Sequence, residues 1–436
     1  MKVNLPLQST AWLLVEKVVY LLISLAVTVA LARYLQPSQF GNLNYLLALV
    51  ALFAPLMTVG LNSIVSREVL LRPDDVDQIL GSSLFLRFCA AVLVIATVVT
   101  ASSYYLTGAN KVFFAVLMMA SIASSAQVVD FWLQAKLANR YSVILRLTML
   151  ICFSLLRLFA IYYAADFAIF VYLIAIELVI TGLLYLLIYQ RLSGGLLVLR
   201  ANRSEIKRLW KDSRWLLMSG IAAIVYLKVD QVMLGVMLDE YSVGVYAAAA
   251  RVSEVWYFIP AAIVTSFFPK LVTIRQADTK LYRVEIQRLN DILFTLAVGI
   301  AIVVSIIGDE LVVWLFGPAY LDSAEIVLVH IWGAVFVFMR ELFSKWLLAE
   351  SFFTLSLLTQ GLGAIANVGL NYFLIPIYGP LGAAYATVIS YSVAGYLVLL
   401  IHPKLWSMAR ITSMSFLLPL RVLRYGRLLY STSRSY

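Results

Sequence analysis

The sequence predicts an all-α integral membrane protein with about 12 transmembrane helices in two six-helix bundles. Composition is the first reason: 63% of the 436 residues are hydrophobic and 13% are charged, whereas soluble domains carry about 25% charged residues. The second reason is that the apolar runs reach the roughly 20 residues that one helical crossing of a bilayer needs. These runs are continuous and do not alternate, so they fit helices and not barrel strands. A repeat with six runs in each half is the third reason.

Twelve apolar segments fit single helical crossings. The first follows a short N-terminal stretch and is too long for a signal peptide, so we expect it to be a span. The approximate bounds are 11–32, 41–64, 80–102, 111–134, 142–164, 167–190, 214–238, 242–269, 289–308, 324–349, 354–375 and 380–402.

Basic residues gather in alternate connectors between these spans. The segment RLSGGLLVLRANRSEIKRLWKDSR carries seven of them, whereas GDELVVWLFGPAYLDSAE on the opposite side has four acids and no base. Cytoplasmic connectors are enriched in lysine and arginine, so both termini are expected in the cytoplasm. The net charge of +10 then reflects basicity at the membrane surface, and no nucleic-acid partner is expected because no DNA- or RNA-binding motif is present.

An internal repeat relates the two halves at an offset of 203 residues. The stretch LQPSQFGNLNY at 35–45 aligns with LDEYSVGVYAA at 238–248, which places Gly41 over Gly244. Six spans in each half give the halves the same orientation. The repeat therefore predicts a parallel pseudo-two-fold axis along the membrane normal, with a cavity between the halves.

Four segments follow from the repeat and the connectors. They are an N-terminal six-helix bundle (1–190), a basic cytoplasmic linker (191–213), a C-terminal six-helix bundle (214–402) and a basic cytoplasmic tail (403–436). In the tail, Arg421, Arg424 and Arg427 recur at a spacing of three among leucines. This pattern is too short and too basic to cross a membrane, and it predicts an amphipathic helix on anionic lipid.

Charged residues inside the spans are the candidate functional residues. Each costs at least ~2.5–3.5 kcal/mol near the bilayer centre, so each must face water or a partner. Bases outnumber acids, eight to six, and this excess favours an anionic substrate. For any single residue, a structural ion pair is at least as good an explanation. The candidate cations are Arg87, Arg146, Arg157, Lys228, Arg251 and Arg340, and the candidate pairing or coupling carboxylates are Asp130, Glu177, Asp230 and Glu254.

Two of these residues interrupt the apolar run IVYLKVDQVMLG. Lys228 and Asp230 are two positions apart, so on a helix they point to different faces and cannot simply pair. Each needs a partner on another helix, or water. In contrast, Arg251 and Glu254 are i,i+3 neighbours, and we expect them to pair.

Motifs for catalysis are missing from the sequence. It contains no GxxxxGK[ST] loop, no HExxH and no paired cysteine ligands, so neither ATP hydrolysis nor metal catalysis is supported. A membrane enzyme such as a glycan polymerase would normally need a large extracytoplasmic loop, and the connectors here are short. We therefore expect a transporter without a cofactor and not an enzyme.

Three stretches in this order resemble the Wzx-type polysaccharide (O-antigen repeat unit) flippases of the multidrug/oligosaccharidyl-lipid/polysaccharide (MOP) exporter superfamily. They are LARYLQPSQFGNLNYLLALVALFAPLMTVGLNSIVSREV, DQVMLGVMLDEYSVGVYAAAARVSEVWYFIPAAIVTSFFPKL and NVGLNYFLIPIYGPLGAAYATVIS. The resemblance covers nearly the whole chain. It implies the two-bundle fold of the MATE drug exporters of the same superfamily.

The resemblance also implies a function. Such a flippase moves an undecaprenyl-diphosphate-linked oligosaccharide repeat unit from the cytoplasmic to the periplasmic face of the bacterial inner membrane, by alternating access. Membrane lipid, a coupling H⁺ or Na⁺, a polysaccharide polymerase and a chain-length regulator are the implied partners. A cation-coupled multidrug antiporter of the same superfamily is the alternative, but it would favour a net acidic cavity.

Overall fold

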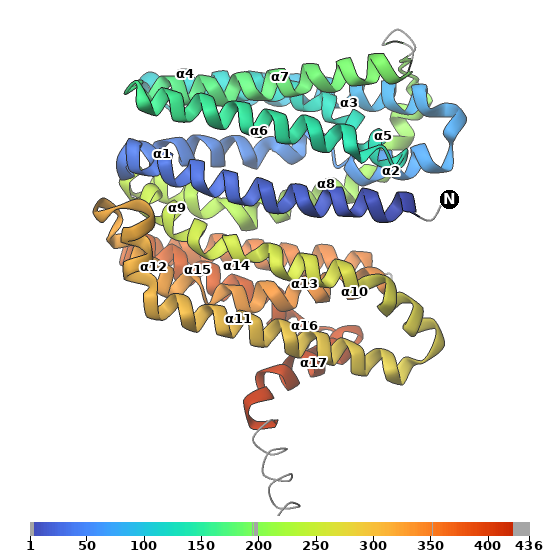
Figure 1. The fold of residues 1–436 in the computed structure, drawn as a ribbon, viewed down its shortest axis with the longest axis vertical. Helices are drawn as coiled ribbons and strands as arrows, with labels where there is room; N and C mark the ends of the chain where they lie inside the picture. Colours follow the sequence, from blue (N-terminus) through green and yellow to red (C-terminus); the bar gives the residue numbers. More distant parts are fainter. Residues whose placement is uncertain (1–3, 194, 196–198, 351, 422–436) are drawn as a thin grey trace, which may run out of the picture. The chain divides into compact units, whose positions relative to one another are not determined.

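The computed structural model describes residues 4–193, 195, 199–350 and 352–421, and these residues form helices joined by short connectors (Figure 1). By packing, the chain divides into two compact units, 1–247 and 248–436. The predicted bundle limits, 1–190 and 214–402, stay a prediction. The predicted helical fold is confirmed.

The first unit contains eight helices among its described residues, and a ninth begins in it. They are α1 (Asn4–Thr58), α2 (Asn62–Leu71), α3 (Val76–Ser102), α4 (Gly108–Ala120), α5 (Val128–Ala135), α6 (Asn139–Tyr162), α7 (Phe167–Ser193), α8 (Arg203–Met237) and the start of α9 (Glu240–Glu254). A 3₁₀ segment, Ser121–Gln127, joins α4 to α5.

The second unit takes up the end of α9 and continues with the remaining helices. They are α10 (Phe258–Ala277), α11 (Thr279–Phe316), α12 (Asp322–His330), α13 (Gly333–Ala349), α14 (Phe353–Tyr378), α15 (Pro380–Ser392), α16 (Val398–Ile401) and α17 (Trp406–Phe416). A π-helical turn, Val393–Leu397, joins α15 to α16.

Eleven helical stretches in the described residues are long and apolar enough to cross a membrane. The first, Val19–Leu71, contains two arms because the backbone leaves the helical region at Gln36 (φ 58°, ψ 168°). Pro37 follows, and a residue before proline is disfavoured in the α conformation. With the two arms counted separately, the stretches correspond to the twelve predicted spans, and the protein is a multi-pass membrane protein.

A second break shortens the predicted span 41–64. Helix α1 ends at Thr58 and α2 begins at Asn62. Between them, Val59 and Gly60 have φ angles of 56° and 65°, in the left-handed region that favours glycine. The apolar pattern of this segment runs straight through the break, so hydropathy alone does not mark it.

The predicted linker 191–213 is partly a helix. Helix α8 begins at Arg203 and is capped by Asn202, whose side chain accepts a hydrogen bond from the backbone N–H of Ser204. This arrangement satisfies one of the free donors of the first turn. The helix packs against α1 and α3 within the first unit.

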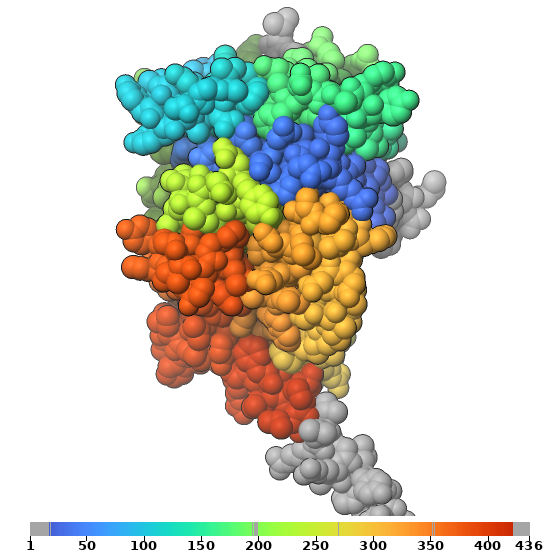
Figure 2. All heavy atoms as spheres, turned by 90° about the vertical axis from the view of Figure 1, so that its left-hand side faces the viewer, coloured from blue at the N-terminus to red at the C-terminus, as the bar shows by residue number. Residues whose placement is uncertain are grey.

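Connectors that were predicted to share one side of the membrane lie at one end of the first unit. The Tyr34 hydroxyl donates to the Ala165 carbonyl at 2.8 Å, and the Asn42 side-chain amide donates to Asn110 at 2.8 Å. Figure 2 views this end, and the segments near residues 40, 105 and 165 all lie on the face turned toward the viewer. The geometry agrees with the predicted order of crossings, while the side that faces the cytoplasm stays a prediction.

Each unit has its own apolar core, and many apolar side chains also lie on the outside. Trp132 and Leu133 lie in the core of the first unit, and Phe338 and Leu342 in that of the second. Exposed positions such as Ile306 are apolar too. A hydrocarbon environment accounts for such residues on the surface, because lipid solvates them without cost.

Candidate functional site

Arg146 and Asp130 form an ion pair in the first unit. The Arg146 Nη1 on α6 lies 2.9 Å from the Asp130 Oδ2 on α5. The Gln134 side chain also donates to Asp130, at 3.0 Å, and Tyr185 on α7 hydrogen-bonds with Arg146. This network joins α5, α6 and α7. The carboxylate therefore neutralises one of the predicted cations.

Arg157 and Glu177 form a second pair, between α6 and α7. The Arg157 Nη2 bonds to the Glu177 Oε2, and both side chains are largely buried. A charge-assisted hydrogen bond of this kind is stronger than a neutral one. Two of the predicted cations thus form ion pairs with two of the predicted carboxylates. This agrees with the explanation that these charges are structural ion pairs.

Arg87 is fully buried on α3 and binds the break between α1 and α2. Its Nε donates to the Thr58 carbonyl at 3.2 Å, and its Nη2 donates to the Asn62 side chain. The Thr58 carbonyl also accepts from the Leu61 backbone N–H at 3.2 Å, because α1 ends there and leaves its last carbonyls without partners inside the helix. The guanidinium also lies 5.6 Å from the ring centroid of Phe131. Arg87 therefore stabilises a helix end, which is a structural role.

Lys228 differs from these arginines. It lies half-buried in the last third of α8, and no ion pair to it is present among the residues that the structure describes. Asp230 is buried two positions later and accepts a hydrogen bond from the Tyr246 hydroxyl at 2.8 Å. As predicted from their spacing, the two residues do not pair with each other.

In the second unit, Arg340 lies on α13 and donates from Nη1 to the Ala394 carbonyl at 2.6 Å. Ala394 belongs to the π-helical turn, and such a turn disturbs the regular backbone hydrogen bonds. The predicted pair of Arg251 and Glu254 is wrong: no ion pair joins them in the described chain, and Arg251 is exposed. Both residues lie within α9, whose backbone is still helical at Glu254. An exposed i,i+3 pair gains too little free energy to hold two long side chains in one geometry.

Sequence reasoning missed a larger charge network around Glu68. This side chain on α2 is buried, yet it accepts bonds from Arg67 at 2.8 Å, from Arg72 at 3.0 Å and from Arg208 on α8. Arg72 also lies 2.5 Å from Glu205. The i,i+4 spacing of Glu68 and Arg72 is a signal that could have indicated part of the network.

The Glu68 network ties the end of α2 to the start of α8. The hydrogen bond from Arg72 to Glu205 raises the pKa of Arg72 above its usual value, so this guanidinium stays charged. Residues that the sequence places in two separate connectors thus form one cluster within the first unit.

A comparison with known families decides what kind of protein this is. Residues 7–275 match the family described as "Polysaccharide biosynthesis protein". The chain belongs to this family. The predicted kinship with polysaccharide transport proteins is therefore confirmed at family level.

This polysaccharide biosynthesis family protein is similar to two curated proteins of the archaeon Haloferax volcanii. It is 28% identical over 214 residues to the probable flippase AglR, covering 47% of this chain and 43% of AglR. It is 23% identical over 223 residues to the probable low-salt glycan biosynthesis flippase Agl15, covering 48% and 47% of the two chains. The chain thus spans less than half the length of each relative.

Two solved membrane transporters have the same fold. An inward-facing multidrug resistance MATE transporter superposes with a TM-score of 0.74 at 15% identity, over 90% of this chain and 95% of that one. The lipid II flippase MurJ gives a TM-score of 0.70 at 14% identity, over 96% and 93%. At these identities the likeness concerns the fold, and the predicted MATE-like fold is confirmed.

Proposed function

We propose that this protein is a flippase, and not an enzyme, that moves a lipid-linked oligosaccharide across the membrane for polysaccharide biosynthesis. The observation that carries the proposal is the family match over residues 7–275. Two similar proteins are described as probable flippases. A fold of many membrane-spanning helices is suited to this function, because helices can enclose a polar path through the membrane. A sugar headgroup that follows such a path does not have to cross hydrocarbon.

The proposed substrate is an undecaprenyl-diphosphate-linked repeat unit, moved from the cytoplasmic to the periplasmic face of a bacterial inner membrane. A prenyl tail can stay in lipid while the headgroup moves. An unassisted crossing would strip many hydroxyl groups and the diphosphate of water, at several kcal/mol per unsatisfied group. Alternating access through a cationic cavity would lower that cost.

Among the predicted cations, Lys228 is our first candidate for contact with the diphosphate. Arg146 and Arg157 are matched by Asp130 and Glu177, so their charge is already balanced. Lys228 is half-buried in a span without an ion pair in the described chain. An ammonium group there is costly unless an anion or water meets it.

The family's name and its relatives favour a glycan carrier over a multidrug antiporter, because the likeness to drug exporters concerns the fold alone.

For coupling to an ion gradient, Asp230 is the candidate carboxylate that would bind H⁺ or Na⁺. A polymerase and a chain-length regulator are the proposed protein partners, since exported repeat units need to be joined.

Deletion of the gene in its host tests the proposal. We expect the amount of surface polysaccharide to fall. The lipid-linked repeat unit should accumulate in the inner leaflet, where a membrane-impermeant lectin added outside cannot bind it. A plasmid copy of the gene should restore the polysaccharide and remove this accumulation. Unchanged surface polysaccharide together with an unchanged leaflet distribution of the lipid-linked unit would contradict a flippase function.

A further inference from the structure

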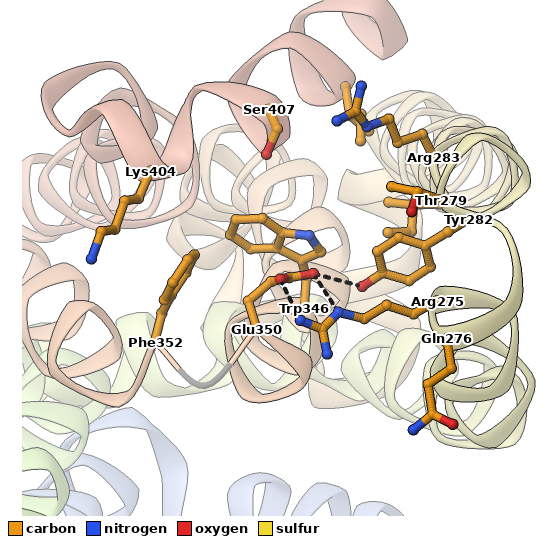
Figure 3. A pocket seen from close by; sticks show the side chains of 12 residues that line it. Arg275, Gln276, Thr279, Tyr282, Arg283, Trp346, Glu350, Phe352, Lys404 and Ser407 are labelled. Atoms are coloured by element: carbon orange, nitrogen blue, oxygen red, sulfur yellow. Dashed lines mark hydrogen bonds and ion pairs between the residues drawn. The ribbon is translucent and has the colours of Figure 1, made fainter.

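The second unit contains a pocket of about 460 Å³ at the end that carries the connector between α10 and α11. Helices α10, α11, α13 and α17 line it (Figure 3). Its volume lies in the range of small-molecule sites. None of the predicted cations lines it, so it is separate from the residues discussed above.

The pocket has an aromatic floor and a polar rim. Tyr282 and Trp346 are buried and Phe352 is partly buried, while Thr279 and Ser407 on the rim are exposed. Helix α11 starts here because Asp278 caps it, accepting hydrogen bonds from the backbone N–H groups of the first turn. In Figure 3 the indole nitrogen of Trp346 lies on the side that faces Tyr282.

The acid of the pocket is already neutralised. Arg275 holds Glu350 in a two-point contact, with Nε 3.0 Å from Oε1 and Nη2 2.8 Å from Oε2. The Tyr282 hydroxyl donates to the same carboxylate at 3.4 Å. The Arg275 and Glu350 charges therefore cancel.

Two further cations of the pocket have no such partner. Arg283 and Lys404 are exposed at its rim, and neither forms an ion pair with any residue that the structure describes. Figure 3 places them on opposite sides of Trp346. Lys404 Nζ lies 5.5 Å from the ring centroid of Phe352. The pocket thus holds two surplus positive charges over an aromatic floor.

We propose that this pocket binds a phosphate group carried by an amphiphilic or small organic molecule. Guanidinium and ammonium groups are the usual phosphate ligands, and the hydroxyl groups of the rim add neutral donors. The aromatic floor suits the apolar or sugar part next to the phosphate. The basic connector 270–288 beside the pocket belongs to the predicted cytoplasmic side, where anionic lipid headgroups gather. The proposal does not depend on the flippase function.

Calorimetric titration of the purified protein tests the pocket with three probes: dihexanoyl phosphatidic acid, dihexanoylglycerol and inorganic phosphate. We expect saturable binding of phosphatidic acid and none of dihexanoylglycerol, which lacks the phosphate. The Arg283→Gln/Lys404→Gln double variant should bind phosphatidic acid at least tenfold more weakly. Both side chains are exposed, so the variant should keep its melting temperature.

The matched control is Lys280→Gln/Arg288→Gln. It removes the same charge from the same region, but neither residue lines the pocket. Its affinity should stay within twofold of the wild type. An equal loss in both variants, or unchanged affinity in the pocket variant, would overturn the proposal.

A pocket-filling variant, Ser407→Trp, leaves the net charge unchanged and should also abolish binding. Competition by inorganic phosphate would assign the site to free phosphate or small phosphate esters. Pocket-dependent binding of phosphatidic acid without that competition would assign it to a lipid headgroup. Absence of binding by both phosphate probes would contradict the proposal.

Discussion

Gly41 on α1 and Gly244 on α9 pack against each other's backbone. A Cβ atom on Gly41 would lie 2.6 Å from the Gly244 nitrogen and closer still to the Glu240 carbonyl oxygen. A Cβ atom on Gly244 would lie 2.7 Å from the Pro37 carbonyl carbon. Neither position has room for a side chain.

This contact is symmetric in the repeat. Gly41 meets residue 240 and Gly244 meets residue 37, and both partners are related by the offset of 203 that aligns the two glycines. Reciprocal contacts of this kind mark a two-fold arrangement. The two copies of the repeated motif therefore pack on each other within the first unit.

Alanine at either glycine should destabilise the protein. The added methyl group meets backbone atoms, which cannot rotate away, so we expect a loss of ~1–3 kcal/mol or more. Gly299→Ala and Gly369→Ala are the controls, because a Cβ there meets nothing within 4 Å and alanine favours helix. Melting temperatures in detergent measure the difference, and equal values for all four variants would rule out the tight crossing.

Glu68→Gln should loosen the start of α8. Removing this buried charge takes one partner from each of three arginines, although Arg72 keeps Glu205 and Arg67 keeps Asp212. We expect a cost of up to ~3 kcal/mol, less than for a fully buried network because Arg67 and Arg208 are half-exposed. Hydrogen exchange of residues 203–213 should rise. The control is Glu285→Gln, because the Glu285 side chain is more exposed than that of Glu68, 17% against 2%. The expected change is below ~1 kcal/mol. Similar effects in both variants would contradict the role of the network.

Arg157 and Glu177 should behave as a coupled structural pair. Arg157→Leu or Glu177→Leu alone leaves a largely buried charge without its partner, whereas the double variant removes both charges. We expect each single variant to lose more thermal stability than the double variant does, with a coupling energy of ~0.5–3 kcal/mol. Additive losses in this double-mutant cycle would show that the two residues act independently.

The helices follow from the sequence because a long apolar run in lipid has few alternatives to a helix. The kink at Gln36 lies in the connector that the sequence predicted between the spans 11–32 and 41–64. The repeat aligned Gly41 with Gly244, but an alignment cannot say that the two copies touch. That contact depends on how helices far apart in the chain are placed.

Charge partners were harder to foresee. Asp130 and Arg146 pair across 16 positions on different helices, and sequence spacing gives no measure of helix rotation. Arg251 and Glu254 had a favourable spacing on one helix, but Arg251 is exposed, and spacing alone does not make an exposed pair form. Glu68 was overlooked because connector charges are usually solvated, whereas here α8 covers it.

Variants of Asp230 distinguish a role of this residue in ion coupling from a structural role. Asp230→Asn keeps a carbonyl oxygen that can accept from the Tyr246 hydroxyl, so we expect near-normal stability, while Asp230→Leu should be unstable. If Asp230 holds the coupling cation, flux in the Asn variant no longer responds to an imposed H⁺ or Na⁺ gradient. Gradient-driven flux that stays at the wild-type level in this variant would remove Asp230 from coupling.

Translocation by purified protein in proteoliposomes tests the central claim most directly. A lipid-linked oligosaccharide is placed in one leaflet, and its appearance in the other is followed with a membrane-impermeant glycosidase. We predict transfer well above that of protein-free vesicles. Lys228→Ala should lower it at least tenfold without loss of melting temperature, and Lys228→Arg should restore part of it because the charge is retained. Transfer by the wild type at the protein-free rate would contradict the flippase account, and wild-type transfer by Lys228→Ala would contradict the role of Lys228.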